Sequence, residues 1–280
     1  MTLVTAHDYT WIRASLLFRR MMESGYTLTL ISGRTPREVL RAMEAEPRGT
    51  GEGTAGLIEA DDTHRAEVDH DYWDESYVAG AFSTPGVNGD WTLVLGFDGG
   101  LGIAAPCAEM LSKGGRVVAH STNGGKPIHL FHWFEDGELR TTFEVPSSRD
   151  GSTPDELVPL LREVRLPLTS EGEHDESAPD VDRKAAVLAL AERLTGVRVT
   201  EALLQDATYE LGLVPEQPAE EWTSVVVDIT DAHGEHLHKE WSYEEIVTAS
   251  DRVRAEANAP VVITYNDSPA RDRSEHETGE

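Results

Sequence analysis

Three histidines near the C-terminal end are the residues best suited to hold a metal ion. His233, His236 and His238 fall within one short segment, and Asp231 precedes them. Imidazole nitrogens are common zinc ligands, and His236 and His238 would share a face of an extended backbone. Their spacing matches no standard zinc motif, and Gly234 beside His233 is typical of a turn. We therefore interpret the segment as a solvated loop and expect no tightly held metal and no cofactor.

Carboxylates and histidines also gather in residues 61–75. The segment begins Asp-Asp-Thr-His at 61–64, continues Asp-His-Asp at 69–71 and reaches Trp-Asp-Glu at 73–75. Such side chains could bind a hard cation or transfer protons. No glycine-ordered calcium loop is present. The alternative function that follows is a metal-dependent hydrolase using Asp and His groups of residues 61–75 or 228–240.

Residues 51–56 read Gly-Glu-Gly-Thr-Ala-Gly, which matches the dinucleotide-binding pattern G-x-G-x-x-G. That pattern binds phosphate only where a strand precedes the glycines and a helix follows them. Here a predicted helix and Pro47 come first, and the flanking residues are acidic. We interpret the segment as a flexible connection.

The remaining reactive side chains point to no catalytic mechanism. Cys107, the only cysteine, excludes an intrachain disulfide. It opens a predicted helix, where the macrodipole could lower the pKa of its thiol, but no partner is visible in the sequence. His120, His129 and His132 lie on predicted strands and are better explained as sheet residues. We therefore assign no catalytic residue.

Helix starts follow from capping boxes. Thr35, Thr153 and Ser242 each precede a glutamate by three residues, so the hydroxyl and the carboxylate can satisfy exposed N–H groups of a first helical turn. Apolar spacing predicts a further helix over about residues 8–22 and another over 183–194, which ends at Gly196. A short helix is expected over 201–205.

Strand patterns alternate with these helices. Residues 26–31 alternate as a half-buried strand does, and 91–97, 116–121, 127–134, 138–143 and 261–265 also read as strands. Asp136-Gly137 is the clearest hairpin turn. The fold class is therefore α+β: a mainly antiparallel sheet flanked by helices, with a smaller C-terminal α/β portion.

The polar segments suggest domain boundaries. Residues 169–182 hold almost no large aliphatic side chain and read as an acidic linker. We expect an N-terminal α+β domain over 1–168, a C-terminal helix and strand portion over 183–266, and a disordered tail over 267–280. The first domain has a net charge of −10, and residues 169–280 have −17.

The composition limits the location and the partners of the chain. It carries 24 basic and 51 acidic residues, a net charge of −27. Such a charge repels the nucleic-acid backbone, so we expect no direct nucleic-acid binding, and it leaves basic proteins open as partners. The acidic residues 169–280 are the candidate surface for a basic partner. No segment is apolar enough for a membrane span, and the N-terminus shows no signal peptide. We expect a cytoplasmic protein.

Six segments match one family in order and in spacing: residues 26–33, 35–40, 91–94, 111–118, 135–139 and 189–198. Together they resemble an uncharacterised family of actinobacterial proteins, a domain of unknown function. The resemblance covers about residues 7–213. It departs at 121–126, where a Trp-Asn type pair is expected and Ser-Thr-Asn-Gly-Gly-Lys is found. Because the family has no assigned activity, the resemblance supports only the fold and the compartment.

Three functions remain open. The first is a non-enzymatic acidic binding or regulatory protein, of the immunity or defence-accessory kind. The second is the metal-dependent hydrolase described above. The third is an acidic mimic of nucleic acid, because a charge of −27 could imitate phosphates.

Overall fold

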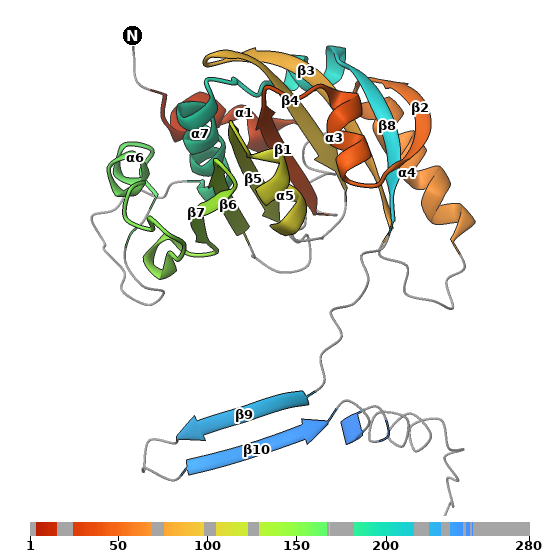
Figure 1. The fold of residues 1–280 in the computed structure, drawn as a ribbon. Helices are drawn as coiled ribbons and strands as arrows, with labels where there is room; N and C mark the ends of the chain where they lie inside the picture. The colour runs from red at the N-terminus through yellow and green to blue at the C-terminus, as the bar shows by residue number, and fades with distance from the viewer. Residues whose placement is uncertain are drawn as a thin grey trace, which may run out of the picture. The chain divides into compact units, whose positions relative to one another are not determined.

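The chain contains two compact units, Met1–Gln217 and Pro218–Glu280. The computed structural model in Figure 1 describes residues 4–15, 25–68, 76–97, 105–122, 129–166, 168, 182–215, 224–230, 236–242, 245–246 and 248. Each unit is described separately below.

The first unit is built on one sheet of eight strands, and all neighbouring strands are antiparallel. This architecture confirms the predicted α+β class. Across the sheet the order is β2 (Glu46–Glu52), β8 (Thr208–Val214), β3 (Tyr77–Gly86), β4 (Gly89–Gly96), β1 (Tyr26–Ser32), β5 (Arg116–Thr122), β6 (His129–Glu135) and β7 (Glu138–Phe143).

Helices cover both faces of this sheet (Figure 1). On one face, α3 and α5 bury Val39, Leu40, Ala108 and Leu111 against the strands. The other face carries the larger core, to which η1, α1, α4, α6, α7 and α8 contribute. The bounds are η1 (Ala6–Tyr9), α1 (Trp11–Ala14), α3 (Pro36–Ala42), α4 (Gly53–Glu67), α5 (Ala105–Leu111), η2 (Pro146–Ser148), α6 (Val158–Glu163), α7 (Arg183–Thr195) and α8 (Glu201–Asp206).

Local signals placed several of these elements correctly. Thr35 and Glu38 form the predicted capping box at α3: the Glu38 N–H donates to the Thr35 hydroxyl, and the Thr35 N–H donates to the Glu38 carboxylate at 2.8 Å. Asp136 and Gly137 join β6 to β7, both with positive φ, as a tight hairpin turn requires. The described residues of the predicted strands at 116–121, 127–134 and 138–143 form β5, β6 and β7, as expected.

Three predictions about single elements were wrong. β1 is buried on both faces rather than half-buried, because helices cover it from either side. Thr153 starts no helix: α6 begins at Val158, and the Glu156 carboxylate instead pairs with Arg140 at 2.6 Å. The helix predicted over 8–22 is interrupted, since α1 ends at Ala14 and Ser15 is extended. Residues 16–22 lie outside the described part.

Residues 46–67 also differ from the prediction. The expected flexible connection is the edge strand β2 followed directly by the 15-residue helix α4. Most of β2 is exposed, and its register shifts between Pro47 and Gly49. The strand therefore lacks the alternating apolar residues by which a half-buried strand is recognised.

Helix α7 belongs to the first unit, although we predicted it in the C-terminal portion. Residues Ala185–Ala191 are buried on every side of the helix, and α7 packs against η1 and β5. The division between units falls at Gln217, not at the predicted linker. Of that linker, Asp182 is the N-cap of α7, and residues 169–181 lie outside the described part.

The second unit contains an antiparallel hairpin of β9 (Ser224–Thr230) and β10 (His236–Ser242). Ser242 and Glu245 make the reciprocal hydrogen bonds of the predicted capping box. The strand predicted at 261–265 and the tail predicted over 267–280 lie outside the described residues.

Candidate functional site

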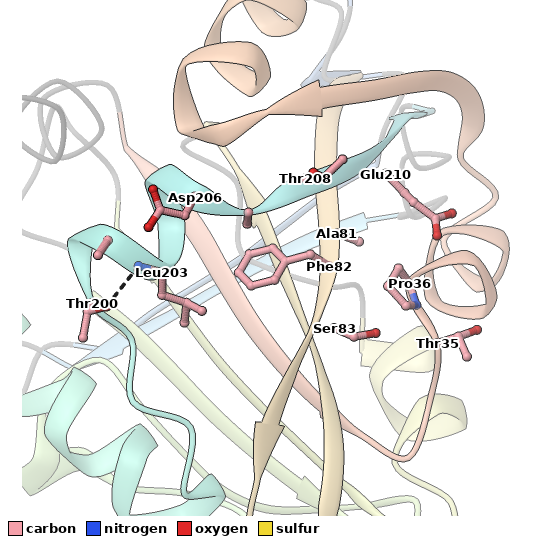
Figure 2. Close-up of a pocket in the computed structure, with 12 residues that line it drawn as sticks. Thr35, Pro36, Ala81, Phe82, Ser83, Thr200, Leu203, Asp206, Thr208 and Glu210 are labelled. Carbon is pink, nitrogen blue, oxygen red and sulfur yellow. Dashed lines mark hydrogen bonds between the residues drawn. The ribbon is translucent and has the colours of Figure 1, made fainter.

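A groove of about 790 Å³ opens on the first unit between α3, β3, α8 and β8 (Figure 2). It exists because β3 and β8 separate: their register ends at Ala81 opposite Glu210, whereas β3 continues to Gly86. The lining residues are Thr35, Pro36, Ala81, Phe82, Ser83, Thr200, Ala202, Leu203, Asp206, Ala207, Thr208 and Glu210.

Helix α8 forms one side of the groove. Its N-cap is Thr200, whose hydroxyl accepts a hydrogen bond from the Leu203 N–H at 3.0 Å (Figure 2). At the other end, the Leu204 carbonyl accepts from the hydroxyls of Thr54 at 3.0 Å and Tyr209 at 3.1 Å. Side-chain hydrogen bonds therefore fix both ends of this short helix, from its own N-cap at one end and from α4 and β8 at the other.

The glycine motif at 51–56 helps to hold this helix in place. The Gly53 N–H donates to the Ala207 carbonyl at 2.8 Å, so a phosphate cannot use it. A Cβ on Gly53 would lie 2.3 Å from the Gln205 backbone oxygen, and a Cβ on Gly56 would lie 3.0 Å from the backbone of Gly51. The strand and helix that a nucleotide motif requires are present, contrary to our reading of the sequence. The glycines nevertheless serve packing between α4, β2 and α8.

Two carboxylates line the groove around an apolar centre formed by Phe82 and Leu203. Asp206 and Glu210 lie on opposite sides of Phe82 in Figure 2. The Phe82 ring is buried and packs edge-on against Tyr209, with centroids 5.0 Å apart. The side chain of Leu203 is half-buried beside it. Four hydroxyl side chains complete the polar part of the lining: Thr35, Ser83, Thr200 and Thr208.

Among the residues that the structure describes, those that line the groove include no lysine, arginine or histidine. The neighbouring Arg37 lies 3.6 Å from the Glu210 carboxylate, but its side chain is 77% exposed. A pair this exposed contributes at most about 1 kcal/mol, so a ligand cation can replace Arg37 at little cost. The lining therefore suits a ligand that carries positive charge and some apolar surface.

Of the histidines predicted as weak metal candidates, the structure describes His236 and His238, and neither is among the residues that line the groove. His236 and His238 are exposed residues of β10, not of the expected loop, and their rings lie 6.5 Å apart on one face of the strand. His238 stands in register with Asp228 of β9. Asp231 and His233 lie outside the described residues, so whether the segment binds metal stays a prediction.

The carboxylates and histidines of 61–75 are only partly described. Asp61 and His64 lie on α4, where Asp61 is buried and His64 contacts the Ser76 hydroxyl at 2.9 Å. Burial raises the pKa of Asp61 above its ordinary value, although Arg65 at 2.8 Å opposes this shift. Residues 69–75 lie outside the described part. Among the residues that can be described, no three His, Cys, Asp or Glu side chains converge on a metal position.

The other reactive side chains have structural contacts. Cys107 donates to the Ala42 carbonyl, and burial raises the pKa of its thiol to about 11, opposite to the lowering that a helix start could cause. The His120 ring contacts the Tyr26 hydroxyl at 2.8 Å within the sheet. His132 contacts Thr142 at 2.9 Å, and burial lowers its pKa. His129 is the first residue of β6.

Sequence reasoning missed the groove because its lining comes from three separated segments, 35–36, 81–83 and 200–210. The short helix at 201–205 was predicted, but β8 was not. The signal available was Thr200, a capping residue just before that helix, followed by alternating apolar residues Tyr209, Leu211 and Leu213.

Comparisons with known proteins give a family but no activity. Within the described residues, no helix is both long and apolar enough to cross a membrane. No curated protein and no solved structure matches the chain. Residues 2–219 match a family of unknown function, DUF6461, and because this match covers most of the chain, the protein belongs to that family.

Proposed function

We propose that the protein is a non-enzymatic binding protein whose groove between α3, β3, α8 and β8 takes a basic segment of a partner protein. The observation that carries this proposal is the composition of the groove: two carboxylates and four hydroxyls around Phe82 and Leu203, with no cationic side chain among the lining residues that the structure describes. The proposed compartment is the cytoplasm.

The charge of the whole chain supports the same partner class. A net charge of −27 attracts a basic protein over a distance and raises its rate of association. Exposed charges more than about 8 Å apart are screened at physiological salt. The long-range attraction is therefore general, and the groove supplies the local contacts that select one segment.

The test is capture of a partner by immobilised protein in three forms. These are the wild type, the groove variant Asp206→Asn with Glu210→Gln, and a control variant, Glu109→Gln with Glu144→Gln. Glu109 and Glu144 are exposed carboxylates that do not line the groove, so both double variants lose the same charge. We expect a basic protein that wild type and control retain, that the groove variant loses, and that rising salt elutes.

Two results would contradict this proposal. One is a partner that the groove variant retains as well as the control does. The other is a partner whose retention does not change with ionic strength.

A further inference from the structure

The backbone of β3 determines how a segment could lie in the groove. The Gly33 N–H donates to the Asp90 carbonyl at 3.1 Å, so Asp90 directs its backbone groups toward the β1 side of β4. In β3, Pro85 stands opposite Asp90. Since antiparallel pairs alternate between bonded and non-bonded, Pro85 directs its carbonyl away from β4. Ser83 lies two residues before Pro85 in the same strand, so it also directs its backbone N–H and C=O away from β4.

At the groove, the edge of β3 that faces away from β4 has no strand paired with it among the described residues. Ala79 and Ala81, which share the parity of Ser83, are in register with Gly212 and Glu210 of β8. Beyond Ala81, no residue in the described part of β8 is in register with β3. Ser83 and Pro85 are both exposed. The proline lacks an N–H, which leaves one donor and two acceptors at this edge: the Ser83 N–H and the carbonyls of Ser83 and Pro85.

Side chains on either side of this edge offer different surfaces. Phe82 and Ser83 are consecutive in a strand, so they point to opposite faces of the sheet. Phe82 packs with the face that carries α8 and Leu203, whereas Ala81 and Ser83 point to the face of α3 and Pro36. An added strand would place every second side chain against the apolar surface at Phe82. Its remaining side chains would point toward Ser83 and Glu210.

We infer that the groove binds an extended basic segment by strand addition to the edge of β3 at Ser83. This inference rests on the proposed function and specifies its binding mode. Main-chain hydrogen bonds to Ser83 hold the segment, as in other cases where a peptide extends a sheet. Alternating apolar and cationic side chains match Phe82 on one face of the sheet and Glu210 on the other. The occupant is therefore a β-forming segment of a basic protein.

The test uses wild-type protein and three synthetic probes of one amino-acid sequence. The parent is an eight-residue peptide of alternating Val and Lys, blocked at both ends. One isomer is N-methylated on the valines and the other on the lysines. Because one edge of an added strand pairs with β3, we expect one isomer to lose at least tenfold in affinity and the other to stay within about threefold. Equal binding of both isomers, or no measurable binding of the parent, overturns strand addition.

A matched pair of variants tests the protein side. Ser83→Pro removes the outward N–H, whereas Ser83→Ala removes only the hydroxyl. We expect Ser83→Pro to weaken the parent peptide about tenfold and Ser83→Ala to leave it within twofold. Equal affinities of the two variants contradict the inference. If Ser83→Pro fails to fold, the comparison of the two N-methylated peptides still tests strand addition, because it uses wild-type protein.

The groove variant Asp206→Asn with Glu210→Gln separates this inference from the proposed function. If it weakens all three probes and the N-methyl isomers bind equally, the acidic groove binds a basic segment but not by strand addition. If it weakens none of them, the proposed function itself is wrong.

Discussion

Gly53 stands where the chain passes from β2 into α4, and two separate constraints require glycine there. Its φ is +62°, a conformation that L-residues adopt only at a cost, and a Cβ would lie 2.3 Å from the Gln205 oxygen. Gly49 offers a comparison, because its φ is +87° but nothing lies within 4 Å of an added Cβ. Comparing substitutions at the two glycines therefore separates the cost of the left-handed backbone from the cost of a collision between the added Cβ and its neighbour.

We predict that Gly49→Ala lowers the free energy of unfolding by about 1 kcal/mol, from the left-handed conformation alone. Gly53→Ala should cost about 3 kcal/mol or more, because the colliding atom belongs to the backbone of α8 and cannot move aside. Urea denaturation of both variants measures the difference. Equal losses would mean that α8 yields easily and that its position over the groove is not fixed by this contact.

Asp61 gives a prediction about pH. Burial raises the pKa of its carboxyl in the folded protein, so folding favours the protonated form. The contribution of Asp61 to stability is then largest below its unfolded pKa and decreases as pH rises through the folded pKa. Asp61→Asn, which imitates the protonated form, should be more stable relative to wild type at pH 7 than at pH 3.

The measurement is the free energy of unfolding of Asp61→Asn and of the control Asp62→Asn, whose residue is exposed on the same helix. The prediction concerns the difference in free energy of unfolding between Asp61→Asn and wild type. If this difference does not change with pH, or changes in the opposite direction, the Arg65 ion pair offsets or outweighs the effect of burial on the pKa of Asp61.

At the scale of elements, the stability of helix α7 depends on the capping of its N-terminus by Asp182. Asp182 accepts hydrogen bonds from the N–H groups of Lys184 and Ala185 and also pairs with Arg13 at 2.5 Å. We predict that Asp182→Ala costs about 1 kcal/mol, the usual loss of an N-cap, with a small addition from the ion pair. Asp182→Asn keeps a capping oxygen and should recover most of the loss in thermal denaturation. An asparagine variant as unstable as the alanine variant would assign the effect to the charge.

The sequence predicted those elements that carry their own local signals. The Asp136-Gly137 turn and the capping box at Thr35 each depend on residues a few positions apart, so both could be read directly. β2 and α4 could not, because Pro47 and the glycines suit an edge strand with a bulge as well as a loop. The groove depends on where β8 leaves β3, which tertiary packing decides and no local pattern reports.

At the scale of the whole molecule, burial predicts where proteases act. Strands β4 to β7 bury large side chains such as Trp91, Phe131 and Trp133. Residues 169–182 and those after Asn266 are polar in sequence. We predict that limited proteolysis cuts first in one of these two segments, because cleavage requires local opening. A first cut within 91–143, identified by mass spectrometry, would contradict this expectation.

The overall charge of −27 draws cations to the whole surface, so the central claim is that the groove, and not charge alone, binds the segment. The direct measurement is the affinity of the labelled alternating Val and Lys peptide for wild type, for Asp206→Asn with Glu210→Gln, and for Glu109→Gln with Glu144→Gln. We predict a loss of about tenfold for the groove variant, as two pairs of about 0.7 kcal/mol each imply, and a loss below twofold for the control. Equal affinities of the two double variants would contradict the account.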